Sequence, residues 1–167
     1  AKKLTDLNDL QHSWEQLLDK LKAFNPRLEL IFTVSPVRHL KDGLIENTRS
    51  KARLHLLVEA LCEVPNCHYF EAYEIVLDQL RDYAYFKDDT VHPNQKAIGV
   101  VWAQFQEKYL DPSTIQILDE WRTLQKSKAH KLLYPESKEA KRLKEEMTKR
   151  TAEFFRKYPD FLDTTPA

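Results

Sequence analysis

The segment Leu28-Glu29-Leu30-Ile31-Phe32-Thr33-Val34, followed at once by Ser35-Pro36, decides the fold of this chain. It is short and mostly apolar, and it comes directly after the turn residues Asn25-Pro26, which is the pattern of a buried strand in a parallel sheet. A second segment of the same kind, 67–72, follows Val64-Pro65-Asn66 and predicts a second strand. The core of the chain is therefore expected around two short strands.

The residues around these strands predict helices. Apolar side chains recur at steps of three and four over 4–24, which predicts a helix with Thr5 or Asp6 as its N-cap. The polar stretch 35–47 predicts a loop, and a second helix is expected from about Ser50. A short helix is expected near 77–83, and Asn94 is placed to cap another that extends to about Tyr109. Helices alternating with strands in this order indicate an α/β fold built from βαβ units.

Two strands are too few for a stable independent sheet, so residues 1–110 are interpreted as the C-terminal half of a larger α/β domain. From 111 to 167 only helical patterns follow, which predicts a helical C-terminal extension. Within it, residues 126–157 hold eleven Lys or Arg and five Glu. Glutamates lie four residues before bases, as in Glu146–Arg150 and Glu153–Lys157, which is typical of a solvated helix. The excess positive charge leaves open a docking surface for a partner or nucleic acid, although nucleic acid is the less expected of the two.

Composition excludes several classes of protein. The 167 residues carry 26 basic and 26 acidic side chains, and the two glycines, Gly43 and Gly99, cannot form a glycine-rich phosphate loop. Two cysteines without CxxC spacing do not make a disulfide scaffold. We expect no membrane span, because no apolar run approaches about 18 residues. No leader is visible, which favours a cytoplasmic location, but the chain opens on Ala1 without a methionine and upstream sequence is expected.

The best candidate for chemistry is Asp89-Thr90-Val91-His92, a carboxylate three residues before an imidazole. The carboxylate can accept the Nδ1–H bond and leave Nε2 to take a proton from a nucleophile. Pro93 keeps His92 out of the helical region, so the pair would lie in a loop just before a helix, where α/β sheets bind ligands. The pattern is short enough to arise by chance, and it occurs again at Asp9 and His12 inside the first predicted helix, where a solvated pair is the better interpretation.

The remaining candidates are weaker. Ser35 ends the first strand but lacks the glycines of a nucleophile elbow, so a backbone-satisfying hydroxyl is favoured over a nucleophile. Arg38 and His39 lie in a loop that could bind an anion or carbonyl, and a structural bond from Arg38 is equally compatible with the sequence. Cys62, Cys67 and His68 lack a fourth ligand at zinc-site spacing, so buried thiols are favoured. We expect no metal and no cofactor.

Longer blocks resemble a known family. The run Thr33-Val34-Ser35-Pro36-Val37-Arg38-His39-Leu40-Lys41-Asp42-Gly43 is similar to the central signature of the GSCFA-domain proteins, and Glu46-Asn47 and Ser50-Lys51-Ala52 follow it. The runs 69–75 and 80–83 and the Asp89-x-x-His92-Pro93 block continue the resemblance in the same order.

The GSCFA family is similar to the SGNH (GDSL-like) hydrolases, which implies a flavodoxin-like three-layer fold with a parallel sheet, here only partly contained in the chain. The resemblance also implies that His92 is the general base of a Ser-His-Asp triad, that Asp89 orients it, and that the loop with Ser35, Arg38 and His39 borders the substrate. The Gly-Ser-Cys-Phe-Ala segment that names the family is absent here. The nucleophile is therefore expected upstream of Ala1, in the missing N-terminal half of the same protein.

Three hypotheses follow for function. The first is the His/Asp-bearing part of an SGNH-type hydrolase acting on an acyl or acetyl ester of a small molecule or carbohydrate, in which this chain alone would be inactive. The second is a non-catalytic α/β module whose basic helical tail docks a partner. The third is an independently folded helical domain with a vestigial two-stranded ribbon, which strands at 28–34 and 67–72 that are not adjacent and parallel would favour.

Overall fold

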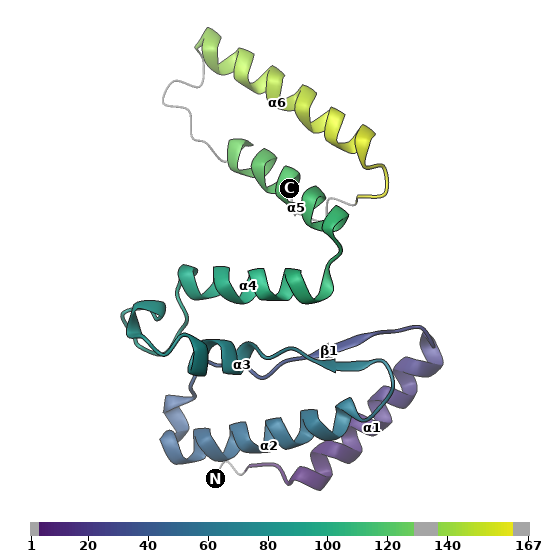
Figure 1. Ribbon diagram of the computed structural model, residues 1–167, viewed down its shortest axis with the longest axis vertical. Helices are drawn as coiled ribbons and strands as arrows, with labels where there is room; N and C mark the ends of the chain where they lie inside the picture. Colours follow the sequence, from purple (N-terminus) through teal and green to yellow (C-terminus); the bar gives the residue numbers. More distant parts are fainter. Residues whose placement is uncertain (1–3, 129–136, 162–167) are drawn as a thin grey trace. The chain divides into compact units, whose positions relative to one another are not determined.

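The structure is a computed structural model, and it describes residues 4–128 and 137–161 (Figure 1). Its contacts divide the chain into two compact units, Ala1–Phe105 and Gln106–Ala167. The first unit contains the two strands and the Asp89/His92 loop. The second consists mainly of two helices. Each unit is described separately below.

The two expected strands form one parallel pair at the centre of the first unit. Strand β1 (Leu30–Phe32) pairs with β2 (Cys67–Tyr69), with Leu30 opposite Cys67 and Phe32 opposite Tyr69. Flanking bonds extend the pairing by one residue at either end, from Leu30 N–H to the Asn66 carbonyl and from Phe70 N–H to the Phe32 carbonyl, each 2.8 Å. The α/β fold class with few parallel strands is confirmed. The hypothesis of an independent helical domain with a vestigial two-stranded ribbon is not favoured, because these strands are adjacent and parallel.

Helices α1 (Leu7–Phe24) and α2 (Leu44–Cys62) cover one face of this pair, as Figure 1 shows below the strands. Their shared core is built on the buried side chains of Leu18, Leu57, Leu61 and Cys67. Trp14 packs edge-on against Phe32 with ring centroids 5.5 Å apart. The apolar periodicity over 4–24 therefore marked a core face, except that Leu17 and Phe24 are exposed. Asp6 caps the helix by accepting the Asn8 N–H at 2.9 Å.

Helix α2 begins at Leu44, six residues before the expected start, and the expected loop 35–47 is correspondingly shorter. A 3₁₀ turn, η1 (Leu40–Asp42), precedes it, and Gly43 at φ +85° supplies the conformation that joins the two. The apolar pattern missed this first turn because Leu44 and Ile45 are exposed to solvent. The spacing of apolar residues detects only those helical turns whose apolar side chains are buried.

The chain between β2 and the last helix of this unit is irregular, and the short helix expected near 77–83 does not form as one element. It contains α3 (Ala72–Glu74), the π-helical turn η2 (Ile75–Gln79) and the 3₁₀ turn η3 (Tyr83–Tyr85). Ile75 and Val76 are the most deeply buried large side chains of the described residues. Helix α4 (Gln95–Tyr109) follows, and its Phe105 meets Phe70 at a ring-centroid distance of 5.1 Å.

The second unit pairs α5 (Pro112–Lys128) with α6 (Lys138–Lys157). Its core is aromatic, with Trp121 of α5 against Phe154 of α6 and Phe161 just beyond it, at centroid distances of 5.1 Å each. Lys157 pairs with Glu120 at 2.8 Å instead of with Glu153, whereas Arg150 does pair with Glu146 at 2.6 Å. Part of the basic segment 126–157 lies outside the described residues.

The core of the first unit leads to a stability prediction. Replacing Leu57, which is 3% exposed, with Ala should lower the free energy of unfolding by about 2–5 kcal/mol, because a buried leucine leaves a cavity. The neighbouring Leu56 is 50% exposed, so Leu56→Ala is the matched control and should change stability by less than about 1 kcal/mol. Urea denaturation of both variants measures the difference, and equal losses would contradict the assigned core.

Candidate functional site

The Asp89/His92 loop is closed at its base by backbone hydrogen bonds. Phe86 and Pro93 form an antiparallel bridge, and the Lys87 N–H donates to the His92 carbonyl at 2.8 Å. Asn94 then locks the loop to the helix: its Oδ1 accepts the N–H groups of Lys96 and Ala97, and its Nδ2 donates to the carbonyls of Ala84 and Phe86. Asn94 is thus the predicted cap of α4, and it also fixes the turn that precedes the loop.

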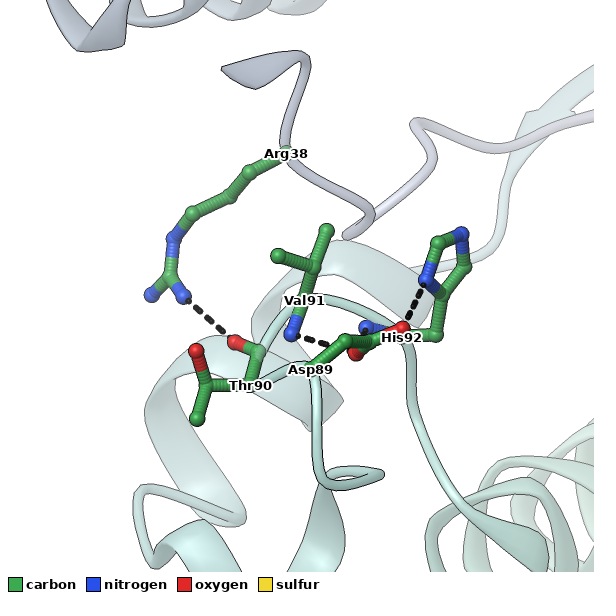
Figure 2. A network of polar contacts seen from close by, with 5 residues as sticks. All are labelled: Arg38, Asp89, Thr90, Val91 and His92. Atoms are coloured by element: carbon green, nitrogen blue, oxygen red, sulfur yellow. Dashed lines mark hydrogen bonds and ion pairs between the residues drawn. The ribbon is translucent and has the colours of Figure 1, made fainter.

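Inside the loop, the Asp89 carboxylate accepts three hydrogen bonds (Figure 2). The N–H groups of Val91 and His92 both donate to Oδ1 at 2.9 Å, and the His92 ring Nδ1 lies 2.7 Å from Oδ2. Val91 is buried, which anchors the loop, while the His92 and Asp89 side chains are 54% and 46% exposed. The loop therefore presents the imidazole to solvent while its Nδ1 side is held.

These bonds also set the charge of Asp89. The His92 N–H first, then the Val91 N–H and the imidazole, lower the pKa of the Asp89 carboxyl to about 2. The group is therefore an ionised acceptor at neutral pH. Because a carboxylate can only accept, the short contact to Nδ1 requires a proton on Nδ1. In the neutral imidazole this leaves Nε2 as the acceptor, which is the tautomer a general base needs.

The turn between Asp89 and Val91 is strained. Thr90 has φ +57°, a left-handed conformation that β-branched residues rarely adopt. Its carbonyl accepts a bond from Arg38 Nη1 at 3.4 Å (Figure 2). The Arg38 guanidinium also lies 5.8 Å from the centre of the Phe86 ring. Strain held by surrounding contacts is common at functional sites. Arg38 thus connects the loop after β1 to the Asp89/His92 loop.

The other side chains of the loop after β1 have local roles in this structure. The Ser35 hydroxyl accepts the Val37 N–H at 3.3 Å, as expected for a serine that satisfies backbone at a strand end. The exposed His39 is held through its backbone, whose N–H donates to Asn47 Oδ1 at 2.8 Å. No contact recorded among the described residues joins Ser35 or His39 to His92. Their predicted place beside the substrate stays a prediction.

The second D-x-x-H match differs from the first. His12 Nε2 accepts a bond from the Gln16 amide at 2.9 Å, and the Asp9 carbonyl, not its carboxylate, accepts the Ser13 hydroxyl. Both residues lie on α1, where the helix and not the carboxylate sets the local geometry. The same four-residue spacing therefore produces the carboxylate–imidazole bond only in the loop.

Cys62, Cys67 and His68 have different surroundings. Cys67 lies in the core, Cys62 is half-buried, and burial raises the pKa of both thiols. His68 Nε2 points to Glu29 at 2.8 Å. Within residues 4–128 and 137–161, no group of three or more His, Cys, Asp or Glu is placed to hold a metal ion.

The burial of Lys51 and its bond to the Ser35 carbonyl were not predicted from the sequence. Its side chain is 94% buried, its Nζ donates to the Ser35 carbonyl, and burial lowers its pKa. The available signal was its position, since Lys51 precedes Leu54 and Val58 by three and seven residues on the buried face of α2. A lysine at such a position is expected to have a buried partner.

A carboxylate that orients an imidazole is an arrangement that some hydrolases use for general-base catalysis. The sequence model of the GSCFA family matches residues 1–105, so this chain belongs to the GSCFA family. That membership suggests a hydrolase-like domain. No curated protein and no solved structure matches the chain. Among the described residues, no helix is both long and apolar enough to cross a membrane.

The site leads to a titration prediction. The pKa of Asp89 is about 2 in the folded chain against an ordinary 3.8, so the folded state binds fewer protons between these values. The hydrogen-bonded Asp89 carboxylate therefore contributes fully to stability above about pH 4, and this contribution is lost as the pH falls through 2. Carbon-13 NMR of the Asp89 side chain should show this low midpoint. In His92→Ala the midpoint should rise only partly, because both backbone donors remain, and a wild-type midpoint near 3.8 would contradict the bonding.

Lys51 leads to a second prediction. Lys51→Met removes the side-chain donor of the Ser35 carbonyl and should lower the free energy of unfolding by about 1–3 kcal/mol. The exposed Lys96 offers a control, and Lys96→Met should change stability by less than about 0.5 kcal/mol. Thermal or urea denaturation of the two variants distinguishes them. An unchanged free energy of unfolding in Lys51→Met would show that the bond does not stabilise the fold.

Proposed function

We propose that this chain supplies the general base, His92, and its orienting carboxylate, Asp89, to an SGNH-type hydrolase acting on an acyl or acetyl ester. The observation that carries the proposal is the 2.7 Å contact between His92 Nδ1 and Asp89 Oδ2 in a loop at the start of α4. GSCFA family membership supports a hydrolase-like domain, and the ester as substrate is our inference.

In the proposed reaction, His92 Nε2 takes the proton of a hydroxyl nucleophile as its oxygen bonds to the acyl carbon. The ionised Asp89 stabilises the resulting imidazolium and keeps its ring in place. The proton then passes from Nε2 to the departing alcohol oxygen as the ester bond breaks. Water repeats the sequence on the acyl-enzyme and releases the acid.

The nucleophile in this proposal comes from a segment upstream of Ala1, which makes the rest of the same protein the required partner. Ser35 is not assigned this role, because the residues around it lack the glycines of a nucleophile elbow. Arg38 supports the loop through the Thr90 carbonyl, and it can still contribute positive charge near an ester. The expected substrate is a small-molecule or carbohydrate ester, and no cofactor is required.

The test is hydrolysis of p-nitrophenyl acetate by the full-length protein that contains this chain. His92→Ala and Asp89→Asn should each lower kcat by about 10²–10⁴-fold, because each removes part of the proton transfer. The second D-x-x-H match provides matched controls, and His12→Ala and Asp9→Asn should retain wild-type rates. Equal rates for His92→Ala and the wild type would overturn the proposal.

A further inference from the structure

An apolar cavity of about 350 Å³ lies within the first unit, next to the Asp89/His92 loop. One wall comes from residues just after β1, Pro36 and Val37, and another from residues just after β2, Phe70 and Ala72. The cavity thus lies at the carboxyl ends of both parallel strands. This is the edge at which open α/β sheets bind their ligands.

Helix α4 forms the remaining wall with four large apolar side chains. Ile98, Val101, Trp102 and Phe105 recur at steps of three, one and three, so they share one helix face. Trp102 stacks on Phe105 at a centroid distance of 5.6 Å, which gives the wall a flat aromatic surface. Ile98 and Trp102 remain 47% and 37% exposed, which is high for side chains of this size. A hydrocarbon ligand would cover them.

Every side chain that lines the cavity is apolar. A sugar or a charged group placed there would leave its hydroxyls or its charge without partners, at a large cost. A chain of methylene groups has no such cost and gains from leaving water. The volume lies in the lower part of the range for small-ligand sites, about 300–1,000 Å³.

The cavity borders the proposed catalytic loop at Pro93, while the side chains of His92 and Asp89 do not line it. Pro93, which lines it, directly follows His92, and Pro36 directly follows Ser35. Val91 is buried on the other side of His92, so the exposed imidazole lies between an anchored residue and a wall residue. Neighbouring Cα atoms are about 3.8 Å apart, which places the His92 backbone at the rim of the cavity.

We infer that this cavity binds the acyl chain of the ester, so that the preferred substrate carries an acyl group of several carbons and not acetyl alone. The inference rests on the proposed function for its chemistry, because His92 must reach the carbonyl at the head of the chain. The alcohol part of the ester would then lie outside the cavity.

Chain length tests this inference in the full-length protein. Each buried methylene should raise kcat/KM about fourfold, so p-nitrophenyl hexanoate, with four more methylenes, should exceed the acetate by about 250-fold. Hexyl acetate, which carries its chain on the alcohol, should show no comparable gain. Val101→Phe fills the cavity and should bring the hexanoate-to-acetate ratio close to one. Ala103→Phe changes an exposed position on the same helix and should leave that ratio unchanged.

A binding measurement separates this inference from the proposed function. In the His92→Ala protein, methyl hexanoate should shift the indole N–H resonance of Trp102 in NMR spectra. Trp14 packs against Phe32 and Trp121 against Phe154, and neither lines the cavity, so both serve as internal controls. The shift should be absent in a Val101→Phe background.

Four outcomes decide the matter. A chain-length gain together with a selective Trp102 shift supports the inference. His92-dependent hydrolysis without a gain, or with the gain on hexyl acetate, overturns it and leaves the proposed function standing. A selective Trp102 shift without any hydrolysis supports the apolar ligand site and overturns the proposed function. No shift, or equal shifts at all three tryptophans, overturns the inference, as when another segment of the protein fills the cavity.

Discussion

The Asp89 carboxylate is the constraint on which the proposed site depends. Its two oxygens accept N–H bonds from Val91, from His92 and from the His92 ring, all within four residues. This arrangement requires Thr90 to adopt a left-handed conformation, and it directs Val91 inward and His92 outward. The same bonds keep the carboxyl ionised, because each favours the charged form. A single side chain thus sets the shape, the charge and the exposed group of the loop.

The loop depends in turn on the parallel pairing of two three-residue strands. Pairing brings the ends of β1 and β2 together, and with them the loop after Phe32 and the irregular segment after Tyr69. Arg38 crosses between these segments to the Thr90 carbonyl, and Lys51 holds the Ser35 carbonyl from below on α2. Each contact satisfies a backbone oxygen near the site, which favours a fixed geometry over a mobile one.

Much of this could be predicted from the sequence, for physical reasons that also mark its limits. The strands, the Asp6 and Asn94 caps and the Asp89–His92 pairing follow from local patterns, because each rests on residues close together in the chain. The start of α2 at Leu44 was not predicted because the apolar side chains of that first turn are exposed. The buried role of Lys51 and the cavity along α4 depend on contacts between distant residues, which spacing alone does not reveal. The catalytic roles of His92 and Asp89, the partners and the division of the chain into functional domains stay predictions.

The central claim is that Asp89 holds the Nδ1–H of His92 and leaves Nε2 as an acceptor. Nitrogen-15 NMR of the imidazole ring measures this directly, because the chemical shifts of the two nitrogens differ with the tautomer. At a pH where the ring is neutral, His92 should carry its proton on Nδ1, and Asp89→Asn should disturb this preference. A proton on Nε2 of His92 in the wild-type protein would contradict the account.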